Sequence, residues 1–129
     1  MLIIRKEQME VFQTALDEDF VVRLSGLIRE EYPEDVADFD DEELHDLVRD
    51  CLARAERYGL TWESSLTLFV VLMFEIAPNF DRQPHIQLLL RDPNIPPDER
   101  IDWVVKHARH EDWADAIRRS DENAWHEEQ

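Results

Sequence analysis

Cysteine, glycine and positive charge are all scarce in this chain of 129 residues. Cys51 is its single cysteine, which excludes an internal disulfide and a metal cluster held by several thiolates. The two glycines, Gly26 and Gly59, belong to no Asn-Gly or Asp-Gly pair, the dipeptides that mark tight hairpins. Because sheets depend on such turns, this composition favours helices.

Long apolar runs are missing as well. Only the first four residues, MLII, are apolar before charge begins, whereas a secretory signal needs a run of about 7–15 residues. The most apolar stretch, residues 66–77, is shorter than the roughly 20 residues that cross a bilayer. We therefore expect a protein of the reducing cytoplasm that has no membrane partner.

Negative charge dominates the chain. Lysine and arginine together number 14 against 31 aspartates and glutamates, which gives a formal net charge of −17. This charge opposes binding to nucleic acid and to anionic lipid, so we expect neither as a partner. A protein with a basic surface would be attracted instead. The alternative explanation is an acidic surface that only maintains solubility.

Apolar residues recur with the period of helices along most of the chain. Residues 66–77 are apolar on every side of a helical wheel except at Thr67 and Glu75. A short helix of this kind is buried by its neighbours on most sides. We predict a compact all-α bundle of five to six helices around a central helix over residues 61–77, forming a single domain over residues 1–119.

The same pattern sets expectations for the core and for the C-terminus. Gly26 falls inside the first helix, where it marks a kink or permits a close helix contact. Residues 120–129 are polar apart from Trp125, so we expect a disordered tail. Four side chains of the central helix should be nearly inaccessible to solvent: Leu68, Val71, Leu72 and Phe74.

Turn and cap residues mark the expected helix ends. Gly59 should adopt the left-handed conformation after the second helix. Thr61 is the expected N-cap of the central helix, and Asp81 that of a short fourth helix. Asp40 or Asp41 should cap the second helix.

Residues that could carry chemistry are few. His107 and His110 lie three residues apart and could share a metal with a neighbouring acid, but the spacing is unspecific and further ligands are needed. An acidic run from residue 38 suggests a calcium loop, yet Glu43 and Arg49 stand where an EF-hand requires glycine and glutamate. There is no nucleophile elbow and no glycine-rich phosphate loop. We predict no catalytic residue, no metal and no cofactor.

Two surface features remain as candidates for binding a protein. Residues 30–50 hold eleven acidic residues and a single cation, Arg49. The chain also has four tryptophans, a residue type enriched at interface hot spots. The alternatives are a solvated helix start for the acids and core packing for the tryptophans, which we favour for Trp103. The predicted protein-binding residues are Glu34, Asp35, Asp38, Asp40, Asp41, Trp113 and Trp125.

Short motifs spread over residues 3–108 carry a family resemblance. They are Lys6-Glu7-Gln8-Met9, the Tyr32-Pro33 helix stop, Arg54-Ala55 with Tyr58-Gly59-Leu60, Leu72-Met73-Phe74, Phe80-Asp81 with Pro84, and Glu99-Arg100-Ile101. With these motifs the chain resembles a family of short bacterial proteins typically encoded beside type VI secretion effectors, spike proteins and effector-loading chaperones. Pro78, where glycine is more usual, and the acidic extension after His110 depart from that family's pattern.

The resemblance implies a non-enzymatic accessory protein that binds an effector, its loading chaperone or a toxin domain. We favour an adaptor or co-chaperone that holds such a protein before secretion, since the family occurs beside different toxins. The alternative is an immunity protein that neutralises a cognate toxin. A small helical enzyme is a third class, for which the residues offer no positive evidence.

Overall fold

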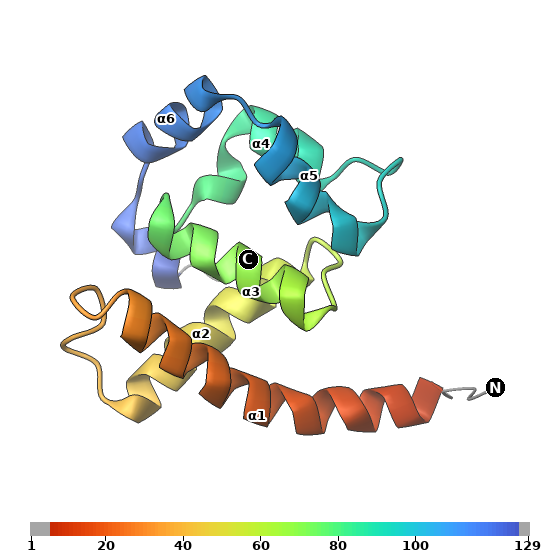
Figure 1. The fold of residues 1–129 in the computed structure, drawn as a ribbon, viewed down its shortest axis with the longest axis vertical. Coiled ribbons are helices and arrows are strands. Elements are labelled where there is room, and N and C mark those ends of the chain that lie inside the picture. The colour runs from red at the N-terminus through yellow and green to blue at the C-terminus, as the bar shows by residue number, and fades with distance from the viewer. Residues whose placement is uncertain (1–5, 127–129) are drawn as a thin grey trace. The chain divides into compact units, whose positions relative to one another are not determined.

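The computed structural model describes the backbone of residues 6–126 and the side chains of residues 18–125. Within this part the chain is all-α, as predicted, and has no strand. The six α-helices, drawn in Figure 1, match the expected number, and none of the helices described is long and apolar enough to cross a membrane. The elements are α1 (Lys6–Glu31), α2 (Asp41–Glu56), α3 (Glu63–Glu75), α4 (Pro84–Leu90), α5 (Arg100–His107) and α6 (His110–Arg118), with short 3-10 helices η1 (Phe80–Arg82), η2 (Pro97–Glu99) and η3 (Glu122–His126).

These helices belong to two compact units, residues 1–45 and residues 46–129, and α2 runs from the first into the second. Both units contain buried apolar side chains. The single domain expected over residues 1–119 stays a prediction. The side chains of the motif Lys6 to Met9 lie outside the described residues.

In the first unit, α1 buries one face of its C-terminal half. Phe20, Val21, Leu24 and Ile28 are each at most 4% exposed, and their spacing is that of one helix face. Gly26 lies on the exposed side, where an added Cβ would meet nothing within 4 Å. Gly26 therefore does not serve a close helix contact.

The start of α2 is fixed by a capping box. The Asp40 carboxylate accepts the Glu43 amide at 2.8 Å, and the Glu43 carboxylate accepts the Asp40 amide at 3.1 Å. Of the two caps expected from the sequence, Asp40 is thus the one in place. A reciprocal pair of this type satisfies two backbone donors that the helix itself cannot.

In the second unit, α3 and α4 both pack against α5, and η1 contacts α4 and α6 (Figure 1). The rings of Tyr58, Phe69 and Phe80 form a row, with centroid separations of 5.7 and 5.0 Å. The side chains that α3 buries are those of Ser65, Leu66, Phe69, Val70, Leu72 and Met73.

The burial expected for α3 is right for one of the four side chains named and wrong for three. Leu72 is 9% exposed, whereas Leu68, Val71 and Phe74 are half-buried. An apolar wheel shows that every face tolerates burial, but it does not show which faces the neighbouring helices cover.

The N-terminus of α3 is capped from a distant part of the chain. The Asp98 carboxylate accepts the amides of Thr61 and Trp62 at 2.7 and 2.8 Å and the Thr61 hydroxyl at 2.7 Å. The expected cap by Thr61 is therefore wrong, because its hydroxyl donates to Asp98 instead of accepting an α3 amide. Gly59 has φ +87°, as predicted, and a Cβ there would lie 3.1 Å from Pro97 Cβ.

The C-terminal segment differs from the disordered tail expected over residues 120–129. Asn79 donates its side-chain amide to the Arg119 carbonyl at 2.8 Å and accepts the Asp121 amide at 3.0 Å. In η3, Ala124 is 2% exposed. The polar composition of the segment gives no indication of these hydrogen bonds or of this burial. Residues 127–129 lie outside the described part.

Candidate functional site

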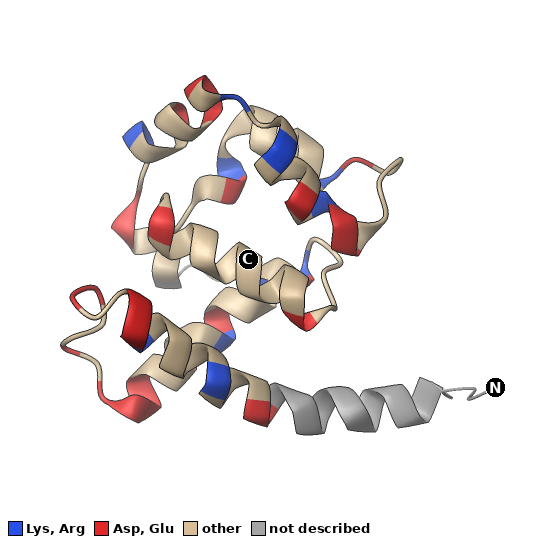
Figure 2. Cartoon of the chain, in the orientation of Figure 1, with Lys and Arg blue, Asp and Glu red and all other residues tan. Residues whose placement is uncertain are grey.

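The five acidic residues predicted to bind a partner lie in or beside one loop of the first unit. This acidic loop comprises residues 32–40, between α1 and α2, and its aspartates and glutamates are the red segments of the ribbon there in Figure 2. The predicted Trp113 and Trp125 belong to the second unit. The structure thus gathers the five acids in or beside one loop, while the two tryptophans belong to the other unit.

One buried apolar side chain and one arginine of α1 hold the acidic loop in place. Val36 is fully buried, while the Arg29 guanidinium donates to the carbonyls of Val36 and Phe39 at 3.5 and 3.1 Å and to the Asp41 carboxylate at 3.2 Å. Loops tied down in this way have few conformations left to lose on binding.

Some acids of this region form bonds that stabilise the fold, and others do not. Asp40 caps α2, and Asp41 pairs with Arg29. Glu34, Asp35 and Asp38 are exposed, and their carboxylates have no hydrogen bond or ion pair with any described residue. These three carboxylates are therefore available to a partner.

The four tryptophans belong to the second unit and differ in burial, from half-buried Trp113 and Trp125 to exposed Trp62 and Trp103. Trp125 is half-buried, stacks on Phe74 at a centroid distance of 4.7 Å and donates its indole N–H to Glu122 at 3.1 Å. Trp113 is half-buried as well. Trp103, for which we favoured core packing, is instead 42% exposed and stacks on His107 at 4.1 Å.

Trp103 lines a groove beside α5 with a cavity volume of about 480 Å³. Ile95 and Pro96 supply apolar surface there, with Lys106 as the one cation of the lining. The remaining lining residues are Asp92, Asn94, Glu99 and Asp102.

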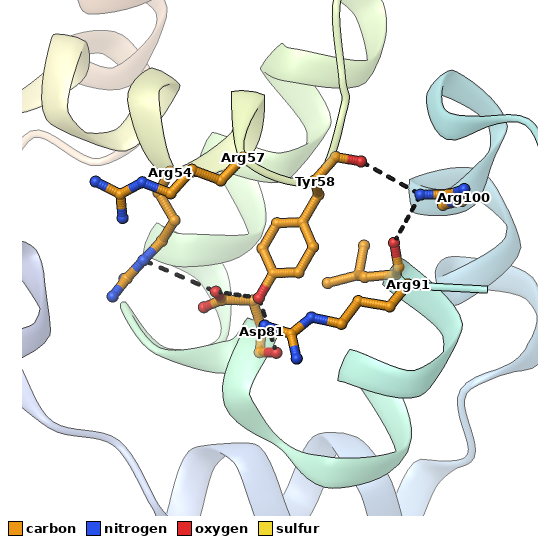
Figure 3. Close-up of a pocket in the computed structure, with 7 residues that line it drawn as sticks. Arg54, Arg57, Tyr58, Asp81, Arg91 and Arg100 are labelled. Atoms are coloured by element: carbon orange, nitrogen blue, oxygen red, sulfur yellow. Dashed lines mark hydrogen bonds and ion pairs between the residues drawn. The ribbon is translucent and has the colours of Figure 1, made fainter. Parts of the chain in front are cut away.

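A second cavity, of about 180 Å³, is lined by arginines, which the sequence analysis did not anticipate. We call it the arginine pocket, and it lies wholly in the second unit (Figure 3). Its lining residues are Arg54, Arg57, Tyr58, Asp81, Leu90, Arg91 and Arg100, with a formal charge of +3. A local positive charge of this size stands out in a chain with a net charge of −17.

Two of these arginines form hydrogen bonds that join separate segments of the second unit. Arg54 donates to the Pro78 carbonyl at 2.7 Å, and its Nε lies 3.8 Å from the Asp81 carboxylate. Arg100 donates to the carbonyls of Ile95, Tyr58 and Leu90 at 2.9, 3.4 and 3.4 Å. Through these bonds Arg100 ties the turn after α2 to the end of α4.

The floor of the pocket is a tyrosine–aspartate pair. The Tyr58 hydroxyl donates to the Asp81 carboxylate at 2.8 Å. Burial, followed by the negative charge of Asp81, raises the pKa of Tyr58 to about 12, so the phenol remains a neutral donor at physiological pH. Asp81 is therefore not the expected cap of α4, a role that the Gln83 side chain fills by accepting the Ile86 amide at 2.9 Å.

The guanidinium groups of Arg57 and Arg91 form no such hydrogen bonds with the described residues. Arg57 is exposed and its guanidinium has no hydrogen bond or ion pair with any described residue. Arg91 is exposed too. Its guanidinium lies over the face of Tyr58, at 5.9 Å from the ring centroid, and has no hydrogen bond or ion pair with any described residue. In Figure 3 the Arg91 side chain lies below the Tyr58 ring, whereas the Arg57 side chain extends away from that ring, on the side opposite Arg100.

A histidine–aspartate pair joins α4 to α6. His85 Nδ1 lies 2.6 Å from the Asp112 carboxylate, which also accepts the Arg109 amide at 2.9 Å. Burial would raise the pKa of Asp112, but these hydrogen bonds outweigh it and lower the pKa. The pair thus helps to cap the start of α6.

Metal binding needs several ligands that converge, and nucleophilic catalysis by a cysteine needs a thiolate. Among the described residues, no three His, Cys, Asp or Glu side chains converge as a metal site would need. Cys51 is 1% exposed, and burial raises the pKa of its thiol to about 12, which keeps it in the unreactive protonated form. The predicted absence of metal and of catalysis stays a prediction.

Comparison of the chain with family models, with curated proteins and with solved structures finds no match.

Proposed function

We propose that the chain is a non-enzymatic protein of the cytoplasm that binds another protein through its acidic loop. The observation that carries the proposal is that three carboxylates are exposed and form no bond within the described chain. Glu34, Asp35 and Asp38 are exposed and without partners in the described chain, on a loop that Val36 and Arg29 hold in place.

Helix capping does not account for these three charges. The dipole of α2 favours anions within its first turn only, and Asp41, Glu42 and Glu43 already occupy that turn. Further like charges on the same short loop repel one another and lower stability. A basic partner surface would relieve that repulsion and would be steered toward the loop.

The family resemblance supplies the biological setting of the proposal. An adaptor or co-chaperone would hold a type VI effector or its loading chaperone before secretion. An immunity protein would use the same acidic surface to neutralise a cognate toxin, since many toxins that act on nucleic acid or membranes are basic. We favour the adaptor and keep the immunity role as the alternative.

Capture of partners from the source cells tests the proposal. The wild-type chain is compared with a variant carrying Glu34→Lys, Asp35→Lys and Asp38→Lys, and captured proteins are quantified by mass spectrometry. A matched control carries the same change of charge at three exposed acids of the second unit, Glu99, Asp102 and Glu111.

We expect a basic protein that the wild type and the control retain and the loop variant loses. Equal capture by all three chains, each with a native circular-dichroism spectrum, would show that the acidic loop is only a solvated surface.

Deletion of the gene separates the two roles. Loss of an adaptor should abolish delivery of one effector and leave the cells healthy. Loss of an immunity protein should instead make the cells sensitive to their own siblings. Healthy deletion cells that still deliver every effector would remove both roles.

A further inference from the structure

We propose that the groove beside α5 binds a linear aliphatic diamine, a small molecule in which an alkyl chain joins two ammonium groups. The groove lies wholly in the second unit and shares no residue with the acidic loop, so this inference goes beyond the protein binding proposed above. It starts from Trp103, a large apolar side chain that is 42% exposed in a groove lined by three acids.

One wall of the groove is the solvent side of the helical segment that runs from η2 into α5. Four residues, each three or four positions from the next along one face, line this wall: Glu99, Asp102, Trp103 and Lys106. The other face of α5 anchors it in the unit, since Ile101 and Val104 are fully buried there. The groove face is therefore not the one that packs α5 into the core.

The other wall is the loop that follows α4, which runs beside α5 in Figure 1. Arg100 Nε donates to the Ile95 carbonyl at 2.9 Å and so ties this loop to the start of α5. The Asp92 carboxylate accepts the Asn94 amide at 2.9 Å, and the ring of Pro96 fixes its φ, here −53°. A groove whose walls are fixed in this way loses little conformational freedom when a ligand binds.

The charge of the groove calls for a cation with two positive groups. Its three carboxylates and the single ammonium of Lys106 give a formal charge of −2. The Glu99 and Asp102 carboxylates have no hydrogen bond or ion pair with any described residue. Each ammonium group of a diamine offers three hydrogen-bond donors to such carboxylates. A cleft lined mainly by one sign of charge also concentrates ions of the opposite sign.

The apolar part of the lining favours an organic cation over a metal ion. Ile95, Pro96 and Trp103 offer surface against which an alkyl chain can lie, and tryptophan is the aromatic residue that attracts cations most strongly. In the described part of the chain, no three acids, histidines or cysteines gather closely enough to hold a metal. The groove acids are therefore spread out, as two separated ammonium groups require.

The size of the groove agrees with a small molecule. Its volume of about 480 Å³ lies within the range of about 300–1,000 Å³ that is typical of small-molecule sites. A diamine with a four-carbon chain fits this space with its chain extended along the groove.

Calorimetric titration at low salt tests the proposal with three probes: putrescine as the diamine, Mg²⁺ as a dication without an alkyl chain, and N-acetyl-lysine amide as a lysine side chain. The full chain is compared with Trp103→Ala, with Asp102→Asn and with the control Glu111→Gln, which removes an exposed acid of α6 outside the groove. Circular dichroism checks that each variant folds. Putrescine should bind most strongly, with about ten-fold weaker binding to each groove variant and unchanged binding to the control.

The other probes and the control separate a built site from general attraction to an acidic protein. Mg²⁺ should bind more weakly than putrescine, and Trp103→Ala should not change its binding. No putrescine binding at about 10 mM, where a millimolar site would be about 90% occupied, would overturn the proposal. Equal weakening by Glu111→Gln, or no weakening by Trp103→Ala, would do the same. Binding of the capped lysine as strong as that of putrescine would also overturn it, by assigning the groove to a lysine of another protein.

Discussion

Removal of the Asp98 carboxylate should destabilise the second unit by about 2 kcal/mol. Asp98→Ala takes away three accepted hydrogen bonds, two from the amides of Thr61 and Trp62 and one from the Thr61 hydroxyl. Each net hydrogen bond contributes about 0.5–1.5 kcal/mol, so three together contribute about 1.5–4.5 kcal/mol. Because Asp98 is partly exposed, water replaces some of these bonds, which places the loss in the lower part of that range, at about 2 kcal/mol.

Urea unfolding, followed by tryptophan fluorescence, measures how much the free energy of unfolding of the second unit falls in Asp98→Ala. All four tryptophans of the chain lie in residues 46–129, so the signal reports on the second unit alone. Glu99→Ala is the matched control, because it removes the exposed neighbouring acid, which does not cap α3. The control should change the free energy of unfolding by less than about 0.5 kcal/mol.

The contribution of Asp98 should also depend on pH. Burial would raise the pKa of Asp98, but the hydrogen bonds from Trp62 and Thr61 outweigh it and lower the pKa in the folded state. A lowered folded pKa adds stability that is fully present above the unfolded value of about 3.9 and is lost as the pH falls through the folded value. The difference between wild type and Asp98→Ala should therefore shrink in acid. A variant as stable as Glu99→Ala at neutral pH would refute the cap.

Three further substitutions test the backbone and the pocket floor. Gly59→Ala should lower the free energy of unfolding by about 1–3 kcal/mol in urea titrations, since its φ of +87° is strained for alanine and Pro97 Cβ lies 3.1 Å away. Gly26→Ala should raise thermal stability by about 0.5–1 kcal/mol, because it adds helix propensity and an added Cβ meets no neighbour. Tyr58→Phe should cost about 1–3 kcal/mol, because the buried Asp81 loses a donor, and should remove a phenol that titrates near pH 12 by absorbance.

The helical class could be predicted because it depends on local patterns. The central helix around the apolar residues, the left-handed Gly59 and the cap by Asp40 each follow from neighbouring residues. The structure has the glycine conformation and the cap, and its helix covers Glu63–Glu75 of the residues 61–77 predicted. The cap of α3 could not be predicted, because Asp98 stands 37 residues from Thr61. No local pattern indicates which distant side chain will reach a helix end.

The arginine pocket was missed for the same reason, although one local signal was present. Arg54 occupies a position three residues after Cys51 and four before Tyr58, on the face of α2 that the helix buries. An arginine on such a face needs a buried partner, and that alone points to a polar site. Its partner Asp81 and the pocket-lining Arg91 come from later elements, so only the tertiary structure brings them to the same pocket.

The exposed acids were predicted correctly as surface residues, but their availability depends on the fold. Arg29 lies near the end of α1 and secures the acidic loop, and neither its bonds to the Val36 and Phe39 carbonyls nor the burial of Val36 is visible in the sequence. Only the tertiary structure therefore shows which acids form bonds within the chain and which carboxylates remain available to a partner.

The rate of association with the captured partner tests the central claim most directly. Surface charges act mainly on this rate and are screened by salt, with a Debye length of about 3 Å near 1 M. With Glu34, Asp35 and Asp38 all changed to lysine, association should slow by about ten-fold or more at low salt and by much less near 1 M salt. The control with lysine at Glu99 and two other acids of the second unit should associate much like the wild type. A loop variant that is folded and associates at the wild-type rate in low salt would contradict the proposed role of the acidic loop.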